Sequence, residues 1–473
     1  MSLDERASLD RRVVVVGAGM AAARLADALA DAGRHVTLLG DEPHPPYNRI
    51  LLSAVLEGTH DPAALELGVR DTVDLRLGTR VVDIHREERE VELADRSRVG
   101  YDALVLATGA IPTLPPIRGL VRPDGRLHEK VHAFRSLADC ERLDAAVGVS
   151  TGSTTAGSAV VVGGGLLGLQ VARALSVRGL AVEVVEGGEH LLRSQVEERA
   201  GRIIARDLTR LGATVYTGAR AVRLTEDGLV LDNGYTLETD LVVLTAGDRP
   251  STALARRAGL EVRRGVVVDE RLRTSDEHIY AIGDCAQRGG TVTGFVPPAW
   301  EQAAVLARHL AGEEASYDPG RHVVRLRATG LDVAVLGDPV HAEGEVVEVT
   351  NPVVGSHRRL VVDGGRIVAG TLVGDLSRIG LITQHFDRGT VLGANEPGLL
   401  LMPDRATAAA EPQLPDDAEV CSCAGVSAGA VRACASLDEV RATTRATTGC
   451  GGCSDAVRRL LDTRSTLLEG TPR

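Results

Sequence analysis

Short apolar runs alternate with helical patterns over the first three fifths of the chain, an order that is typical of parallel α/β sheets. The first series runs through a strand at 13–16, a helix at 20–32 and a strand at 35–39, and the second through 160–162, 166–178 and 181–185. A glycine-rich turn separates the first strand from the helix in each series. The pattern therefore predicts two copies of one strand–turn–helix–strand unit.

The remaining pattern divides the chain further. Buried-strand runs recur at 101–106, 240–244 and 279–282, an amphipathic helix covers 298–310, and short Val-rich strands with Gly turns fill 322–394. We expect an α/β fold with these parts: a first Rossmann-like domain at 11–115 and 240–312, a second at 116–239, a small α+β domain at 320–394, a linker at 395–419 and a small helical domain at 420–465. Residues 395–419 are predicted to be a linker because they are rich in Pro, Ala and acids and lack periodicity.

Composition narrows the possible partners. The chain has 473 residues, 44% of them hydrophobic, and a formal net charge of -12. This is a globular composition, and the acidic balance without a basic stripe argues against nucleic acid or an anionic membrane as partner. The first residues are acidic and polar and no apolar run approaches the roughly 20 residues of a membrane span, so we expect a cytoplasmic protein without a signal peptide.

The glycine turns have the spacing of dinucleotide-binding sites. The first contains Gly17, Gly19 and Ala22, and the second contains Gly163, Gly165 and Gly168. The first two positions bring backbone N–H groups close to a pyrophosphate, the helix N-terminus stabilises its charge, and a small third residue lets helix and strand pack closely. One such motif can be a mere tight turn, but two, each followed by an acidic residue at the end of the next strand, predict two bound dinucleotides.

The order of these motifs resembles the two-dinucleotide-domain flavoprotein reductases, the family of ferredoxin, rubredoxin and nitrite reductase flavoproteins, over residues 11 to 312. The resemblance implies FAD in the first domain and a nicotinamide dinucleotide in the second. It also implies that Asp41 and Glu42 hold the adenosine ribose, Arg49 lies by the flavin and Val81 touches the adenine. The other residues that it assigns to the cofactor sites are Ala107, Thr108, Gly109, Gly247, Gly283 and Asp284.

Glu186 bears on the choice of nicotinamide cofactor. It ends the second strand of the second motif, where a carboxylate accepts hydrogen bonds from a ribose 2′-hydroxyl and repels a 2′-phosphate. We therefore expect NADH as the cofactor. The alternatives are that Glu186 is a solvated strand-end residue, or that nearby Arg193 holds the phosphate of NADPH.

Catalytic side chains of related enzymes are missing. The helix at 20–32 has no cysteine pair for disulfide chemistry, and Ala54 stands where related oxidases carry a lone cysteine. Many ferredoxin reductases of the family carry a lysine at that place, paired with a glutamate that is Gln170 here. We accordingly assign no catalytic side chain, and how the flavin N5 edge is tuned stays open.

Five of the seven cysteines lie near the end of the chain, where Cys421, Cys423, Cys450 and Cys453 form two close pairs. By spacing alone four thiolates suit a [2Fe-2S] cluster or a structural zinc ion. The string around these pairs resembles the bacterioferritin-associated ferredoxin domain, which implies that the four bind a [2Fe-2S] cluster. Cys434, between the pairs, is expected to be a packed thiol.

The order of modules resembles that of NADH-dependent nitrite reductase large subunits, in their N-terminal part, and of assimilatory nitrate reductase electron-transfer subunits. The printed sequence ends 20 residues after Cys453, so we expect no sirohaem-binding half. The resemblance implies an oxidoreductase that passes electrons from NADH through FAD and the cluster to a separate terminal reductase, of nitrate first and nitrite second. The alternatives are a ferredoxin or rubredoxin reductase for an oxygenase, and a redox- or iron-sensing interaction protein.

Overall fold

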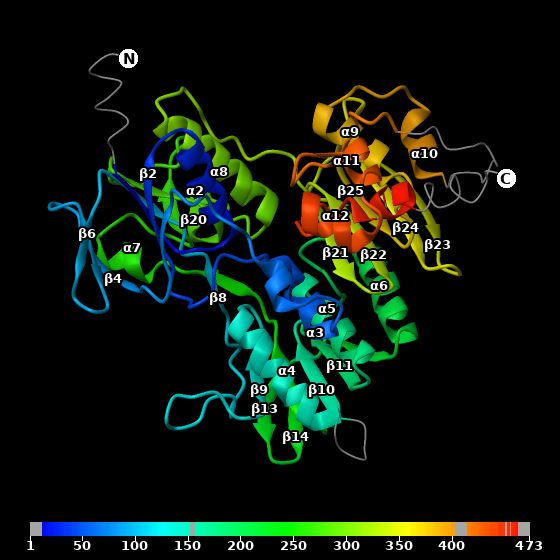
Figure 1. Ribbon diagram of the computed structural model, residues 1–473. Coiled ribbons are helices and arrows are strands. Elements are labelled where there is room, and N and C mark those ends of the chain that lie inside the picture. Colours follow the sequence, from blue (N-terminus) through cyan, green and yellow to red (C-terminus); the bar gives the residue numbers. More distant parts are fainter. Residues whose placement is uncertain (1–11, 152–156, 403–413, 450–451, 455, 462–473) are drawn as a thin grey trace, which may run out of the picture. The chain divides into compact units, whose positions relative to one another are not determined.

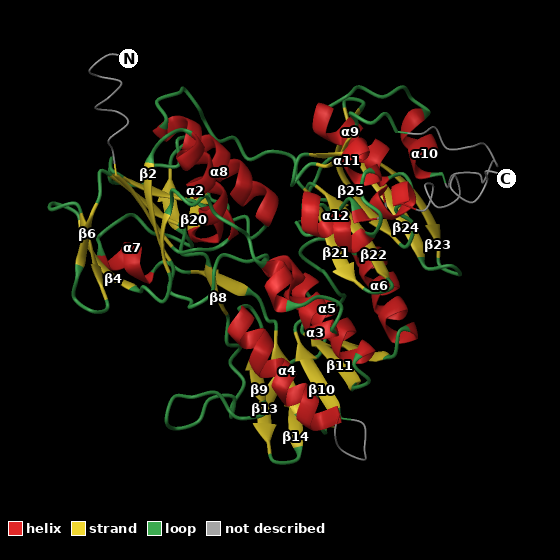
Figure 2. Cartoon of the chain, in the orientation of Figure 1, coloured by secondary structure: helices red, strands yellow, loops and turns green. Residues whose placement is uncertain are grey.

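The computed structural model describes residues 12–151, 157–402, 414–449, 452–454 and 456–461. The chain divides into two compact units, the first formed by 1–62 and 66–402 and the second by 63–65 and 403–473. Figure 1 follows the chain by colour, and Figure 2 separates its helices from its strands. In the described residues no helix is long and apolar enough to cross a membrane.

The first unit contains a parallel sheet that carries the first glycine motif. Its strand order is β19(Ile279–Ala281), β7(Ala103–Leu106), β1(Arg12–Val16), β2(His35–Leu39) and β3(Asp74–Arg76). Helices α2(Met20–Asp31) and α8(Val296–Leu310) lie side by side on this sheet (Figure 1). Val13 to Val16 are buried, as expected for a central strand of a parallel sheet that is covered on both faces.

A second parallel sheet carries the second glycine motif. Its order is β12(Ala213–Thr217), β11(Ala181–Glu186), β10(Ser158–Val162), β16(Leu241–Leu244) and β9(Val131–Ala133), with helices α4(Leu137–Thr151), α5(Leu166–Val177) and α6(Glu198–Arg210). The predicted boundary at 240 is wrong, because β16 pairs with β10, Val161 opposite Val243, and so belongs to this sheet rather than to the first. Its four residues are all buried, and such a run does not by itself say which of two parallel sheets it joins.

The chain passes between these sheets twice. Strand β8(Ala110–Pro112) leaves the first sheet and β17(Asp248–Pro250) returns from the second, and the two crossovers pair antiparallel, Ala110 opposite Pro250. Smaller elements complete this part: η1(Arg49–Leu51), α3(Leu52–Glu57), η2(Pro62–Leu65), β4(Val81–His85), β5(Glu90–Leu93), β6(Arg98–Gly100), β13(Ala221–Thr225), β14(Gly228–Leu231), β15(Thr236–Leu237), α7(Ala253–Arg257), β18(Val266–Val268), η3(Gly283–Cys285) and β20(Ala286–Arg288).

The predicted α+β region forms an antiparallel sheet in the first unit. Its order is β21(Val323–Ala328), β22(Leu331–Leu336), β25(Arg366–Val373), β24(Ser356–Asp363) and β23(Glu345–Asn351), packed against α9(Ile379–Arg388) and α10(Glu396–Leu401). The prediction of a linker from 395 is wrong for its first residues, because α10 buries Leu400 and Leu401 in the core of this sheet. Residues 403–413 of the predicted linker lie outside the described part.

The second unit is small. It contains β26(Glu419–Cys421), β27(Val426–Ser427), α11(Ala428–Arg432) and α12(Leu437–Thr444). The hydroxyl groups of Ser427 and Ser436 accept hydrogen bonds from backbone N–H groups in the first turns of α11 and α12, so each helix has an N-cap. Three cysteines, Cys421, Cys434 and Cys453, are part of its hydrophobic core.

Candidate functional site

The two glycine turns have the same construction. Gly17 has φ +103, and a Cβ there would lie 2.3 Å from the carbonyl oxygen of Ala107. Gly163 has φ +118, and a Cβ there would lie 2.5 Å from the carbonyl oxygen of Thr245. Only glycine tolerates both the positive φ and the approach, so each turn lies directly on the end of the strand next to it.

The second and third motif positions explain where a dinucleotide fits. Gly19 and Gly165 precede α2 and α5, and a Cβ at either would meet nothing within 4 Å. A Cβ at Gly168 would lie 1.9 Å from the carbonyl oxygen of Gly163, whereas Ala22 of the first motif accommodates its Cβ and is fully buried. Open space at a helix N-terminus, bordered by backbone N–H groups, is the environment that a pyrophosphate requires.

Other predicted cofactor residues lie at the carboxyl ends of the same strands. Ala107, Thr108 and Gly109 follow β7, and Gly247 follows β16. The positions at Gly109 and Gly247 are also open, since both have positive φ values and a Cβ at either would meet no atom within 4 Å. In open parallel sheets ligands bind at this edge, so the structure provides room for a dinucleotide at both sheets.

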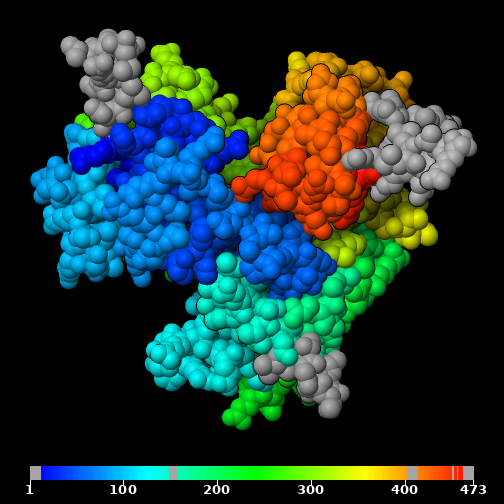
Figure 3. Space-filling view, viewed as in Figure 1, coloured from blue at the N-terminus to red at the C-terminus, as the bar shows by residue number. Residues whose placement is uncertain are grey.

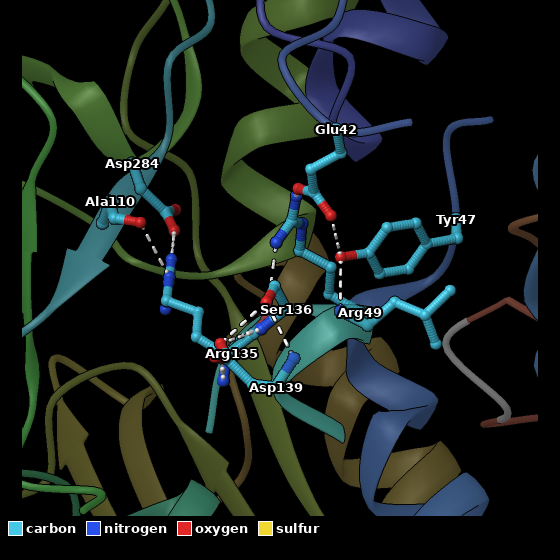
Figure 4. A network of polar contacts seen from close by, with 9 residues as sticks. Glu42, Tyr47, Arg49, Ala110, Arg135, Ser136, Asp139 and Asp284 are labelled. Carbon is cyan, nitrogen blue, oxygen red and sulfur yellow. Dashed lines mark hydrogen bonds and ion pairs between the residues drawn. The ribbon is translucent and has the colours of Figure 1, made fainter. Parts of the chain in front are cut away.

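Asp284 is held by a residue that the sequence analysis did not identify. Its Oδ2 accepts a hydrogen bond from Arg135 Nη2 at 2.7 Å (Figure 4). The preceding residue, Gly283, has φ +72 and donates its N–H to the Oε1 of Gln302 in α8 at 2.7 Å. Arg135 thereby orients the carboxylate of the predicted flavin-binding aspartate, and Gln302 fixes the backbone just before it.

Arg135 also connects the two crossovers. Its Nε donates to the carbonyl oxygen of Ala110 in β8 at 2.9 Å, and its Nη1 forms an ion pair with Asp248 in β17. Burial and then the nearby Asp284 carboxylate act to raise the pKa of Asp248 above its usual value, although Arg135 opposes this. One guanidinium thus joins both interdomain strands to the aspartate of the predicted FAD site.

Glu42 and Arg49 form a second group at the first sheet. Arg49 Nη2 forms an ion pair with Glu42, and the guanidinium lies 4.8 Å from the centroid of the Tyr47 ring. The Tyr47 hydroxyl donates to Glu42 Oε2 at 2.7 Å and accepts from the N–H of Leu137 at 2.9 Å (Figure 4). Burial is the main cause that raises the pKa of Tyr47, so this phenol stays protonated.

This group affects the predicted ribose contacts. The Glu42 carboxylate is directed at Arg49 and Tyr47, while Asp41 is exposed. Val81 begins β4 and packs on the core of the first sheet. The assignments of Asp41 and Glu42 to the adenosine ribose and of Val81 to the adenine stay predictions.

Glu186 lies beside the second motif, as expected. Its Oε2 accepts from the N–H of Gly164 and its Oε1 from the N–H of Gly188, each at 2.7 Å. Arg193 Nε lies 3.5 Å from Oε1, and the Glu186 side chain is only 13% exposed. The carboxylate is therefore fixed at the glycine turn and is not a solvated strand-end group.

Helices α3 and α5 pack against each other and carry Ala54 and Gln170. In the space-filling view the blue surface around α3 adjoins cyan and green surface (Figure 3), in agreement with the contacts of α3 with α4 and α5. The one charged residue of each helix turns elsewhere: Glu57 accepts from the Thr329 hydroxyl, and Arg173 donates to the Thr329 carbonyl oxygen at 2.7 Å. Arg178, the C-cap residue of α5, donates from Nη1 to the carbonyl oxygen of Leu56 in α3 at 2.9 Å, so one charged side chain takes part in the contact although Ala54 and Gln170 are uncharged.

The cysteine module brings three predicted ligands together. Hydrogen bonds from the thiols of Cys423 and then Cys453 lower the pKa of Cys421, and Cys453 Sγ accepts from the N–H of Thr447 at 3.2 Å. The fourth predicted ligand, Cys450, lies outside the described residues. Among the residues that are described, no three His, Cys, Asp or Glu side chains have the arrangement of a complete metal-ion site.

The chain next to Cys450 fits a close approach of sulfur atoms. A Cβ at Gly449 would lie 3.3 Å from Cys423 Sγ, so glycine gives this loop room beside the thiol. Thiolates with backbone N–H donors suit a [2Fe-2S] cluster. Cys434 is buried and its sulfur contacts the Thr443 hydroxyl at 3.3 Å, in agreement with a packed thiol.

Sequence reasoning missed Arg135, Asp248 and Tyr47. Arg135 lies just before α4, where Ser136 and Asp139 share a hydrogen bond at the start of the helix. That turn could have been found as a helix start signal. No sequence pattern indicates that the arginine reaches two aspartates more than 100 positions away.

Two family models match the chain. Residues 11–304 match the model described as pyridine nucleotide-disulphide oxidoreductase, and residues 419–463 match the model described as BFD-like [2Fe-2S] binding domain. The first implies FAD and NAD(P)H as cofactors and the second a [2Fe-2S] cluster, as the sequence analysis predicted.

Curated relatives match nearly the whole chain. The nitrite reductase [NAD(P)H] of Bacillus subtilis is 33% identical over an alignment of 474 positions, which covers 95% of this chain and 57% of the relative. The assimilatory nitrate reductase electron transfer subunit of the same organism is 30% identical over 473 residues, 95% of this chain and 59% of the relative. The chain thus spans about half the length of these relatives.

Solved structures share the fold of the first unit. The putidaredoxin reductase–putidaredoxin complex has a TM-score of 0.74 at 25% identity and covers 83% of this chain and 96% of the reductase. A ferredoxin reductase from Rhodopseudomonas palustris has a TM-score of 0.70 at 29% identity, over 77% of this chain and 91% of that chain. The first is a reductase in complex with putidaredoxin, and the second is named a ferredoxin reductase.

Proposed function

The chain belongs to the pyridine nucleotide-disulphide oxidoreductase family and carries a BFD-like [2Fe-2S] binding domain, and we propose that it passes electrons from NADH to a separate terminal reductase. That acceptor is the catalytic subunit of an assimilatory nitrate reductase, with a nitrite reductase as the second candidate. The observation that carries the proposal is the presence in one chain of two dinucleotide sites and a cysteine module with Cys421, Cys423 and Cys453 in contact.

The residues of the first sheet suit FAD. Gly17 and Gly19 make the turn that would receive the pyrophosphate, and Asp284 is oriented by Arg135. Gly163, Gly165 and Glu186 would hold NADH in the same way at the second sheet. When bound, FAD takes up a two-electron hydride and gives up electrons singly, and a [2Fe-2S] cluster carries one electron at a time.

The relatives support the direction of transfer. One is named an electron transfer subunit, and the putidaredoxin reductase complex shows a related reductase joined to its protein acceptor. These names support a protein electron acceptor for this chain, and the relative named a nitrate reductase electron transfer subunit is our reason for proposing nitrate reductase as that acceptor. A cytoplasmic location, expected from the sequence, stays a prediction.

The test is to replace Cys450, one of the four predicted ligands, by serine. Cys450→Ser should leave NADH-dependent ferricyanide reduction within about twofold of wild type, since hydride transfer uses only the first unit, and should abolish NADH-dependent nitrate reduction by the cognate reductase. Cys434→Ser is the matched control, because this thiol contacts Thr443 and is not a predicted ligand. FAD, iron and sulfide contents are measured in each preparation.

Three results would contradict the proposal. Stoichiometric zinc without iron in the wild-type protein would exclude the cluster. Full nitrate reduction by the Cys450→Ser variant would show that electrons do not pass through the module. Very slow reduction of ferricyanide by wild-type protein would favour the sensing alternative.

A further inference from the structure

Thr447, in the loop before the predicted ligand Cys450, has an unusual backbone conformation. Its φ is +70, in the left-handed region that β-branched residues strongly disfavour. It is also 4% exposed, so the conformation is imposed inside the module rather than at a free surface. Strained positions of this kind persist where the surrounding structure holds them, and they concentrate at functional sites.

The conformation directs the Thr447 N–H at sulfur. This N–H donates to Cys453 Sγ at 3.2 Å, and it also contributes to the lowered pKa of Cys421. The donor therefore lies at a member of the second predicted cysteine pair. A threonine with an ordinary negative φ would turn the peptide plane and lose this orientation.

A second residue holds Thr447 in place. Arg441, in α12, donates from Nε to the Thr447 hydroxyl at 3.2 Å, and its guanidinium pairs with Asp438 one helical turn earlier. Between them, Arg445 ends α12 with φ +59, which reverses the chain toward the sulfurs. The helix therefore fixes the side chain of Thr447, and the side chain fixes the direction of its N–H.

We propose that Thr447, held by Arg441, is a positioning residue that raises the reduction potential of the [2Fe-2S] cluster by donating its N–H to the sulfur of Cys453. The proposal rests on the assignment of Cys421 and Cys453 as cluster ligands. Reduction adds negative charge to the cluster, and a fixed N–H donor at the sulfurs stabilises that charge. Loss of the donor should make the cluster harder to reduce.

The experiment is a potentiometric titration of the full chain, followed by visible absorbance and by the EPR signal of the reduced cluster. Thr447→Val keeps shape and charge but removes the hydroxyl that Arg441 holds. At a fixed potential the ratio of reduced to oxidised cluster should fall by up to about tenfold, which for a one-electron couple is a shift of about 59 mV. Thr447→Ser keeps the hydroxyl and should have the reduction potential of the wild-type protein.

Thr443→Val is the matched control. Its hydroxyl contacts Cys434 and the carbonyl oxygen of Glu439 in the same module, but no predicted ligand, so its potential should equal that of wild type. Arg441→Ala should lower the reduction potential more in the wild-type background than in the Thr447→Val background, because the two substitutions break the same hydrogen bond, from Arg441 Nε to the Thr447 hydroxyl. If Thr447→Val does not assemble a cluster, Arg441→Ala alone carries the test, and its potential should then lie below those of Thr443→Val and wild type; a potential equal to theirs would overturn the role of Thr447.

The outcomes separate the two proposals. The role of Thr447 would be overturned if the reduction potential of Thr447→Val equalled those of Thr443→Val and wild type. It would also be overturned if Arg441→Ala changed the potential equally in both backgrounds. Either result would leave the electron-transfer proposal intact. A wild-type protein without an iron–sulfur EPR signal would overturn both. A shifted potential together with failure to reduce nitrate reductase would support Thr447 and overturn only the choice of acceptor.

Discussion

Replacement of Glu186 by alanine tests the assignment of the nicotinamide site most directly. The carboxylate accepts one backbone N–H on each oxygen, from Gly164 and Gly188, and Arg193 approaches one oxygen at 3.5 Å. A carboxylate has about four acceptor positions, so a position remains for the 2′-hydroxyl of NADH. The same negative charge, 13% exposed, disfavours the 2′-phosphate of NADPH.

The size of the effect follows from this geometry. A hydrogen bond to a charged group contributes about 1.5 to 3 kcal/mol, and Glu186→Ala removes it from NADH while it removes repulsion from NADPH. The preference for NADH, expressed as the ratio of the two kcat/KM values, should therefore fall by roughly 1 to 3 kcal/mol, which is about fivefold to 150-fold. Most of the change should appear in KM, because the ribose lies away from the reacting carbon.

The assay is ferricyanide reduction with NADH and with NADPH, which does not require the protein acceptor. Glu183→Ala is the matched control, since Glu183 lies on the same strand and accepts from the Tyr216 hydroxyl at 2.8 Å instead of lying at the glycine turn. Its cofactor preference should equal that of wild type. Wild-type protein that prefers NADPH would refute the assignment and give the site to Arg193.

Two further predictions concern residues that join the parts of the first unit. Arg135→Ala should weaken FAD binding by about tenfold or more, the scale of losing a hydrogen bond to a charged group, measured as FAD retained after gel filtration; the exposed Arg142→Ala should retain FAD fully. For Glu197, burial acts to raise the pKa, but the hydrogen bond from His357 and smaller contributions lower it overall. The ionised Glu197 therefore stabilises the folded state above about pH 4.3, the pKa of an unfolded glutamate. This stabilisation is lost as the pH falls through the pKa of Glu197 in the folded state. Glu197→Gln should lower the melting temperature at pH 7 and should make the melting temperature fall less between about pH 5 and 3. The exposed Glu198→Gln should change neither. A Glu197→Gln variant with the melting temperatures of wild type would contradict the role of His357.

The parts that the sequence predicted well are those fixed by local backbone geometry. The helix after the first motif was predicted for 20–32, and it begins at Met20, where the glycine turn ends. Strand β16 was placed in the wrong sheet because its partner, β10, lies about 80 positions away and its apolar run suits either sheet. Helix α10 was predicted to be part of a linker, because proline and glycine in so short a segment are typical of loops and no helical periodicity is visible around the two leucines that it buries.

The same distinction applies to the site. Gly17 and Gly163 were identified from the spacing of glycines, because a turn without room for a Cβ requires glycine at that position in the sequence. No such requirement is visible in the sequence for Arg135, because its role is to connect three segments that approach one another only in the folded chain. Sequence motifs therefore predict where the nucleotides bind, whereas long-range ion pairs such as those of Arg135 connect segments of the two sheets and become visible only in the folded chain.

The charges that act on the flavin follow from this arrangement. Ala54 and Gln170, where the resemblance leads one to expect a lysine–glutamate pair, carry no charge, and the charged residues of α3 and α5, Glu57 and Arg173, both bind Thr329. The described guanidinium groups near the predicted FAD residues are instead Arg49, paired with Glu42, and Arg135, shared by Asp248 and Asp284. Charges in a partly buried site are screened little by solvent. We therefore infer that the cations of the predicted FAD site are these two ion-paired arginines rather than a pair across the helices.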